Sequence, residues 1–215
     1  MFGLSDRDLK AKLGHLPIIG LCGAIASGKS YVANVFAKHG CAVFDADAEA
    51  HRILDKHAED VRNHWKSGDD LIRGDGTVDR SKLSALIFDA HRPEWSMDWL
   101  EGLMFPDLYE ARDKFIEMHN DKMPIVLDCP LLFEKGWNDL CDYIIFIHAP
   151  RNVLLERARQ RGWDEEHYKN MESLQWSVEK KEKMADMIIC TVPPHSDEIT
   201  DIVASTILEI SRSKK

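Results

Sequence analysis

Long apolar runs, clustered metal ligands and a leader-like start are all absent from this sequence of 215 residues. No apolar stretch approaches the roughly 20 residues that a membrane-spanning helix needs, which excludes a transmembrane protein. The ten histidines form no H-E-x-x-H or similar cluster, which argues against a structural or catalytic zinc ion. Residues 1–16 lack the basic start and apolar centre of a signal peptide. We therefore expect a soluble protein in which residues 1–16 are an N-terminal extension with a short helix.

Cysteine is scarce, and no two cysteines have the C-x-x-C spacing of a zinc or redox site. The five in the chain are Cys22, Cys41, Cys129, Cys141 and Cys190. An odd, scattered set does not suit a disulfide framework, and the first three lie in or beside predicted core strands. We interpret them as small buried hydrophobic residues in a reducing compartment, which predicts a cytoplasmic protein.

Positive charge is also in short supply, because the formal net charge is −9. A general nucleic-acid binder would usually carry a basic face, so this charge argues against one. An acidic protein that binds a polyphosphate must gather its few cations at one place. Arg157, Arg159 and Arg161 form such a local group.

The clearest signal in the chain is Gly23-Ala24-Ile25-Ala26-Ser27-Gly28-Lys29-Ser30, which has the pattern G-x-x-x-x-G-K-[ST]. An apolar strand at 17–22 precedes it and a helical pattern at 31–39 follows it, as a phosphate-binding loop requires. Backbone N–H groups and the helix dipole then face the phosphates, Lys29 reaches the outer phosphates and the Ser30 hydroxyl ligates Mg²⁺. An ordinary turn before a helix is the alternative. The residues expected to bind the nucleotide here are Gly23, Ala24, Ala26, Ser27, Gly28, Lys29, Ser30 and Tyr31.

Short apolar runs alternate with helical patterns, which predicts an α/β fold: a five-stranded parallel sheet with helices on both faces, of the P-loop kinase type. The predicted strands are 17–22, 41–44, 125–128, 142–148 and 185–190. The predicted helices are 31–39, 51–57, 78–89, 93–120, 151–160, 165–184 and 197–211. We expect one domain over 17–212, with a helical region at about 49–122 for the second substrate. Pro106 should kink or break the long helix around it.

Carboxylates follow two of the predicted strands, where an α/β sheet faces its ligands. Asp45 and Asp47 end the second strand, and one of them could take the proton of an acceptor hydroxyl. Capping of the next helix is the alternative role. Asp128 ends the third strand and resembles the carboxylate that holds Mg²⁺ through water in many P-loop proteins.

The arginines lie at the base of a predicted helical hairpin that spans about 157–183. Arg157 and Arg161 are four residues apart and share one helical face, whereas Arg159 points elsewhere. A lid that closes over phosphates has this composition, because arginines neutralise charge that builds up on the transferred group. A solvated basic helix face is the alternative.

Several stretches, in this order and spacing, resemble the dephospho-CoA kinase family across roughly 17–192. They are the loop at 23–30, Phe44-Asp45-Ala46-Asp47, Asp75-Gly76-Thr77-Val78-Asp79-Arg80, Pro130-Leu131-Leu132-Phe133-Glu134, Arg157 with Arg161, Gln175, and Ala185-Asp186. The loop is shared by many kinases, but the other stretches together are fairly specific. The resemblance implies transfer of the ATP γ-phosphoryl group to the ribose 3′-hydroxyl of dephospho-CoA, the last step of coenzyme A synthesis.

The resemblance also implies roles for individual residues. Catalysis would depend on Lys29, Arg157 and Asp47, the last as the base. ATP would be held by the loop together with Arg157 and Arg161, and Mg²⁺ by Ser30. The residues matched to the acceptor are Asp47, Arg80, Leu131 and Gln175. No nucleic acid, membrane or obligate protein partner is expected.

The chain departs from the family pattern at a few positions. Phe105 precedes Pro106 where a His-Pro pair is usual, which removes a polar group near the expected acceptor site. Ala24 and Ala26 replace loop glycines, which is tolerable if their backbone angles stay negative. Tyr31 replaces a threonine, and Cys190-Thr191 stand where the last strand commonly leads to an asparagine.

Two other functions remain open from the sequence. Another nucleoside or nucleotide-type kinase would share the loop and the lid, and acceptor tests would separate it. A non-catalytic ATP-binding homologue would bind ATP without forming product from dephospho-CoA.

Overall fold

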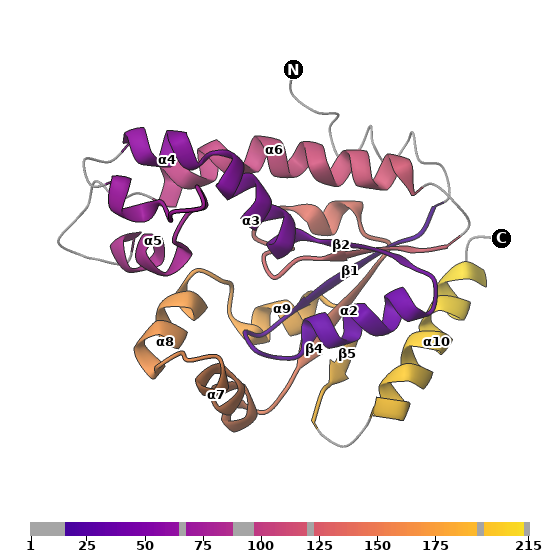
Figure 1. The fold of residues 1–215 in the computed structure, drawn as a ribbon. Helices are drawn as coiled ribbons and strands as arrows, with labels where there is room; N and C mark the ends of the chain where they lie inside the picture. Colours follow the sequence, from indigo (N-terminus) through magenta and orange to yellow (C-terminus); the bar gives the residue numbers. More distant parts are fainter. Residues whose placement is uncertain (1–15, 65–67, 88–96, 120–122, 193–195, 213–215) are drawn as a thin grey trace. The chain divides into compact units, whose positions relative to one another are not determined.

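A computed structural model describes residues 16–64, 68–87, 97–119, 123–192 and 196–212 (Figure 1). The short helix predicted within residues 1–16 lies outside these ranges. The described chain divides into two compact units, residues 47–113 and the remainder. We describe each unit by itself.

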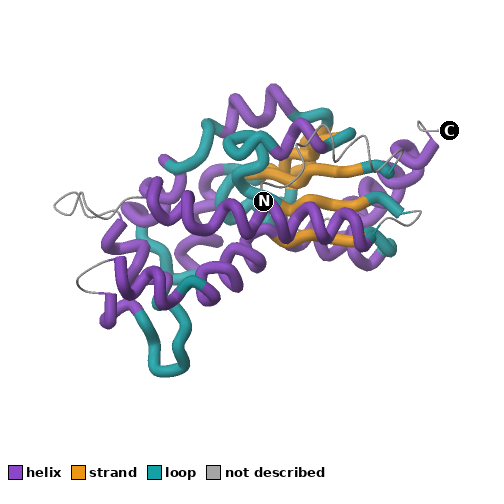
Figure 2. Tube along the Cα trace, turned by 90° about the horizontal axis from the view of Figure 1, so that it is seen from above, coloured by secondary structure: helices purple, strands orange, loops and turns teal. Residues whose placement is uncertain are grey.

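The larger unit is built on five parallel strands, as predicted (Figures 1 and 2). In chain order they are β1 (Ile18–Gly23), β2 (Ala42–Asp45), β3 (Ile125–Asp128), β4 (Tyr143–His148) and β5 (Met187–Cys190). Their order across the sheet is β2-β3-β1-β4-β5, with β1 in the centre. The carboxyl ends of β1 and β3 are therefore neighbours, and this places the loop after β1 beside Asp128.

Alternating strand residues cover the two faces of this sheet. Ile19 and Leu21 of β1 join the core that α2 (Lys29–Lys38) and α10 (Ser196–Arg212) complete on one face. The intervening Gly20 approaches Leu132 so closely that an added Cβ would lie 2.7 Å from its Cδ2 atom. Each fully buried Ile or Leu stabilises the fold by about 1.5–3 kcal/mol, so the apolar strand runs fix the position of the loop at 23–30.

Residues 47–113 form the smaller, helical unit. Its elements are most of α3 (Ala46–Lys56), α4 (Ala58–His64), the 3-10 helix η1 (Gly68–Leu71), α5 (Arg80–Ile87) and the first part of α6 (Met97–Met118). Helix α3 begins five residues before its predicted start at residue 51, because β2 passes directly into α3. Helix α6 continues through Pro106, so of the two predicted effects of this proline, a kink or a break, the break does not occur. The core is formed by Leu54, Val61, Leu71, Val78, Leu83 and Leu100.

The segment after β4 contains three helices rather than the predicted two. They are α7 (Arg151–Gln160), α8 (Glu165–Ser173) and α9 (Val178–Met184). Pro150 is the N-cap of α7. The single helix predicted over 165–184 is wrong because Ser177 starts α9 as its N-cap, with its hydroxyl accepting a hydrogen bond from Lys180 N. The break leaves Gln175 and Trp176 outside either helix.

The cysteines are all free thiols, and Cys22, Cys41 and Cys129 are buried as expected. Burial raises the pKa of Cys22 to about 12 and that of Cys41 to about 11. Among the described residues, no helix has both the length and the apolar character required to span a membrane.

Cys22 should therefore resist alkylation while Cys190 reacts. A raised pKa keeps the Cys22 thiol protonated at pH 8, and burial blocks access, whereas Cys190 is exposed. The native protein is treated briefly with iodoacetamide, and peptide mass mapping then measures how much of Cys22 and of Cys190 is alkylated. Treatment in denaturant is the control, in which both peptides should be modified. Rapid labelling of native Cys22 would contradict the burial of this strand end.

Candidate functional site

The loop from Gly23 to Ser30 joins the end of β1 to the start of α2, as its motif predicts. Gly28 is the N-cap of α2 and has a φ of 93°, in the left-handed region that favours glycine. At Gly23 an added Cβ would lie 2.5 Å from Ile147 O and 2.8 Å from Ser27 Oγ. The path of this loop, which packs against β4 at Gly23 and enters α2 at Gly28, thus requires both motif glycines.

Ala26 also has a positive φ, of 61°. The condition for a tolerable alanine, a negative φ, is therefore not met at this position. Left-handed backbone costs a non-glycine residue about 1–2 kcal/mol. The methyl group is buried in an apolar cluster whose other buried members are Ala149, Leu154, Ala158 and Tyr168. Burial of the methyl group contributes about 0.8 kcal/mol, which offsets part of the cost and joins the loop to α7 and α8.

Ser27 gives a direct indication of a ligand. Its side chain is buried, and among the described residues its Oγ atom has no hydrogen-bond partner. An unsatisfied buried hydroxyl costs about 1–3 kcal/mol. A phosphate oxygen in the loop would remove this cost, and the N-terminus of α2 favours the same anionic group. The loop therefore fits a nucleotide phosphate.

Lys29 and Asp128 form an ion pair between the start of α2 and the end of β3. The Asp128 side chain is only 2% exposed, and Asp45 is its partner in the register of β2 and β3. Ser30, the next residue of α2, is exposed. Hydroxyl and carboxylate oxygens suit Mg²⁺, which keeps several of its waters when it binds proteins. Ser30 and Asp128 are the residues of this group that fit such an ion.

Within the described ranges, no group of three or more His, Cys, Asp or Glu side chains could hold a metal ion by itself.

Arg157 holds the backbone of the phosphate loop from α7. Its Nη1 donates to Ser27 O at 3.0 Å, to Ala26 O at 3.4 Å and to Thr191 Oγ1 at 3.0 Å, and its Nη2 donates to Thr191 O at 2.6 Å. The Thr191 hydroxyl also donates to Ser27 O. Sequence reasoning noted Thr191 only as a departure from the family pattern. Its contact with the loop was not predictable, because it joins residues 164 positions apart.

We expect Arg157→Lys to destabilise the protein by about 1–3 kcal/mol, because a lysine cannot reproduce the forked donors that reach several oxygens at once. Urea unfolding measures the change. Arg159→Lys is the matched control, since Arg159 lies on the same helix and is exposed. Equal stability of the two variants would show that the contacts of Arg157 contribute nothing to the loop.

The other predicted site residues of the larger unit lie in different environments. Arg161 is exposed and is the C-cap of α7. Tyr31 is 44% exposed on the first turn of α2. Leu131 is partly exposed in the loop after β3. Gln175 lies in the break between α8 and α9.

Asp47 and Arg80 belong to the smaller unit. Asp47 is exposed in the first turn of α3. Arg80 is the first residue of α5, with its Nη1 atom 3.6 Å from Asp55 Oδ2. Asp55 Oδ1 in turn accepts a hydrogen bond from Val78 N at 2.9 Å, so Asp55 joins α3 to the segment that starts α5. Phe105 is partly buried, with its ring centroid 6.0 Å from that of Tyr109.

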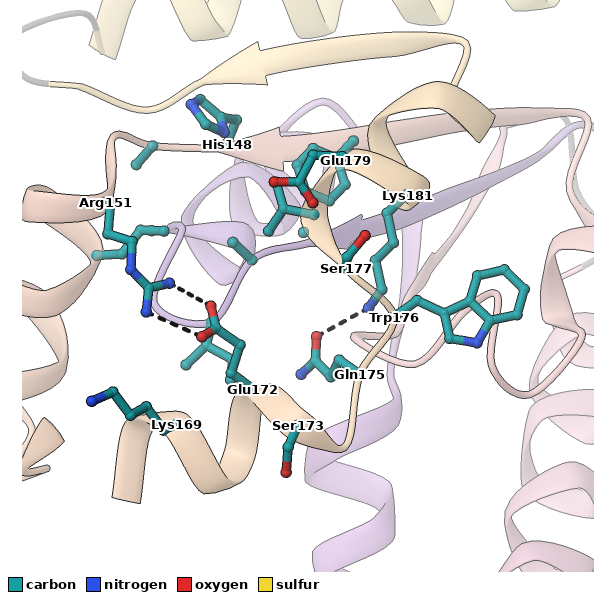
Figure 3. A pocket seen from close by; sticks show the side chains of 17 residues that line it. His148, Arg151, Lys169, Glu172, Ser173, Gln175, Trp176, Ser177, Glu179 and Lys181 are labelled. Carbon is teal, nitrogen blue, oxygen red and sulfur yellow. Dashed lines mark hydrogen bonds and ion pairs between the residues drawn. The ribbon is translucent and has the colours of Figure 1, made fainter. Parts of the chain in front are cut away.

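A pocket of about 650 Å³ lies beside the first residues of the phosphate loop (Figure 3). Gly23, Ala24 and Ile25 line it together with residues from β4, α7, α8 and α9, and Gln175 is among them. On one side Arg151 and Glu172 form a two-bonded ion pair at 2.5 and 3.1 Å. The structure thus brings Gln175 and the phosphate loop to one cavity.

Comparison with known proteins gives a consistent result. The family model described as Dephospho-CoA kinase matches residues 17–192. A dephospho-CoA kinase of Wolbachia pipientis wMel is 35% identical over 176 residues, which cover 81% of this chain and 88% of that protein. A crystal structure of a Thermus thermophilus protein is similar to this chain, with a TM-score of 0.74 and 30% identity. The match covers 91% of this chain and 98% of that chain. A dephospho-CoA kinase from Campylobacter jejuni has the same fold, with a TM-score of 0.60 and 21% identity. The match covers 93% of this chain and 100% of that chain.

Proposed function

The chain belongs to the dephospho-CoA kinase family, and from this premise we propose how its own residues carry out the phosphorylation of dephospho-CoA, the last step of coenzyme A synthesis. The observation that carries the proposal is the loop at 23–30, with Lys29 at the start of α2 and the unsatisfied, buried Ser27 hydroxyl. This group suits a polyphosphate donor, which we take to be ATP. The free cysteines support a place in the cytoplasm.

The donor phosphates bind to the loop amides, the Ser27 hydroxyl and Lys29, in line with the dipole of α2. Ser30 and Asp128 would hold Mg²⁺, which when bound neutralises negative charge on the phosphates. Arg157 keeps the loop in shape through Ala26 and Ser27, and its charge adds to the positive field there.

Asp47 accepts the proton of the ribose 3′-hydroxyl as the new bond to phosphorus forms. Support for this role comes from its position two residues after β2, in the first turn of α3, and from its match to the family's Asp-Ala-Asp stretch. We propose that the helical region at about 49–122, including Arg80, binds the acceptor, and that Leu131 and Gln175 also contact it.

The segment at about 157–183 acts as the lid in this proposal. Arg161 is exposed and is available to reach phosphates when the lid closes. Closure would exclude water and so favour transfer to the acceptor over hydrolysis.

A coupled assay of ATP consumption tests the proposal, with dephospho-CoA and a panel of nucleosides as acceptors. We expect turnover with dephospho-CoA and formation of coenzyme A, identified by mass spectrometry. Preference for a nucleoside would support the alternative small-molecule kinase. Binding of ATP without product from any acceptor would support the non-catalytic alternative. The relatives reported above favour the first outcome.

A further inference from the structure

Lys181 is a buried cation that neither the motif nor the family resemblance singles out. Its side chain is 2% exposed, on the short helix α9. Lysine is almost never buried to this extent unless its charge is paired. Breaking such a pair is costly, yet replacing it with apolar residues is often neutral for stability. The stability of the pair alone therefore does not explain Lys181, whose contacts position neighbouring groups.

The Lys181 ammonium group has three donors and meets three acceptors. They are Pro130 O at 2.8 Å, Glu134 Oε1 at 2.8 Å and Gln175 Oε1 at 3.0 Å. The same Glu134 oxygen accepts a hydrogen bond from Trp176 N at 2.6 Å. Lys181 and Glu134 thus attach the break between α8 and α9 to the loop that follows β3.

The contact with Lys181 decides which way the Gln175 amide faces. An ammonium group donates and never accepts, so it requires the amide oxygen of Gln175. The amide nitrogen must then point the other way, and Figure 3 shows it directed away from Lys181, towards the pocket. Within the described part of the chain, this nitrogen donates to no protein group. Gln175 therefore offers N–H donors to whatever occupies the pocket.

We propose that Gln175, oriented by Lys181, donates a hydrogen bond to a phosphate oxygen of the substrates. The pocket that Gln175 lines also contains Gly23, Ala24 and Ile25, the first residues of the phosphate loop, so phosphate is the oxygen-bearing group that the loop brings there. In this inference, which rests on the proposed function, Gln175 is a binding residue and Lys181 is a positioning residue.

Gln175→Glu is the first test, because it replaces the donor with an anionic oxygen of the same shape. The variant keeps an oxygen for Lys181, so its thermal midpoint should be at or above that of the wild type. We expect kcat/KM for dephospho-CoA to fall by about 10²-fold, the loss seen when one preorganised donor is removed. A purely structural glutamine would be replaced by glutamate without loss of activity.

The second test removes the orienting charge without leaving its partner buried and unpaired. Lys181→Met combined with Glu134→Gln should fold, and should raise KM or lower kcat by about tenfold because the Gln175 amide is free to turn. Lys180→Met is the matched control, since Lys180 lies on the same helix and its Nζ atom packs 3.0 Å from the centroid of the Trp176 ring, on the surface. We expect the control to stay within about twofold of the wild type.

The outcomes separate this inference from the proposed function. Wild-type turnover with dephospho-CoA is measured first, and its absence contradicts the proposed function. If the wild type turns over and Gln175→Glu is equally active, the donor role of Gln175 is wrong. If Gln175→Glu loses activity but the combined variant behaves as the wild type, the positioning role of Lys181 is wrong. Loss of activity in both, with thermal midpoints preserved, supports the whole inference.

Discussion

Asp47→Asn is expected to lower kcat by about 10²–10⁴-fold, because the amide cannot accept the proton of the 3′-hydroxyl. Binding of ATP should be largely kept, since Asp47 lies on α3 and outside the phosphate loop. Initial-rate kinetics with dephospho-CoA give kcat, and titration calorimetry with a non-hydrolysable ATP analogue gives the affinity.

Glu49→Gln is the control for Asp47. Glu49 is a second carboxylate in the first turn of α3, where its Oε2 atom lies 2.8 Å from Arg52 Nη2. Both substitutions remove one negative charge near the same helix N-terminus, so they change the helix dipole interaction equally. A difference in kcat between them therefore reports the chemistry of Asp47. Unchanged turnover in Asp47→Asn would remove this residue from the mechanism.

Lys29→Met is expected to weaken both ATP binding and turnover, with kcat/KM lower by about 10²–10³-fold. The reason is that Lys29 supplies positive charge at the start of α2, where the outer phosphates bind. The substitution also takes a cation from Asp128, whose side chain is 2% exposed, and breaking a buried pair costs about 3–5 kcal/mol of stability.

Loss of folding and loss of catalysis must be separated in this experiment. Adding Asp128→Asn to Lys29→Met removes both charges and should recover stability in urea unfolding without recovering activity. Lys38→Met, at the other end of α2, is the matched control and should leave both measurements unchanged. Near-normal kinetics for Lys29→Met would refute the assignment of the phosphate loop.

The fold was largely predictable from the sequence because its signals are local. All five strands appear where apolar runs predict them, and the helices between them require parallel pairing. The phosphate loop was equally clear, since its glycines, Lys29 and the flanking elements are fixed by short spacing along the chain. The strand order across the sheet was not predicted, because it depends on long-range pairing.

Errors arose where distant groups override a local preference. An alanine at position 26 prefers a negative φ, but the loop requires a left-handed residue there, and α7 and α8 supply apolar contacts to its methyl group. The segment 165–184 has the composition of one helix. Ser177 caps a new helix within it, and Trp176 N turns to Glu134, which lies 42 positions earlier.

The sequence by itself determined that this chain carries a phosphate loop between a buried strand and a helix, because that motif works through neighbours in the chain. Only the tertiary structure decided that Arg157 holds the loop's carbonyl oxygens and that Lys181 turns the amide of Gln175 towards the pocket. Gln175 is only six positions from Lys181, but Lys181 is itself held by Pro130 O, 51 positions away, and Arg157 contacts Ser27 O, 130 positions away. Spacing along a chain does not specify such pairs, because they form only when the parallel sheet brings its strand ends together.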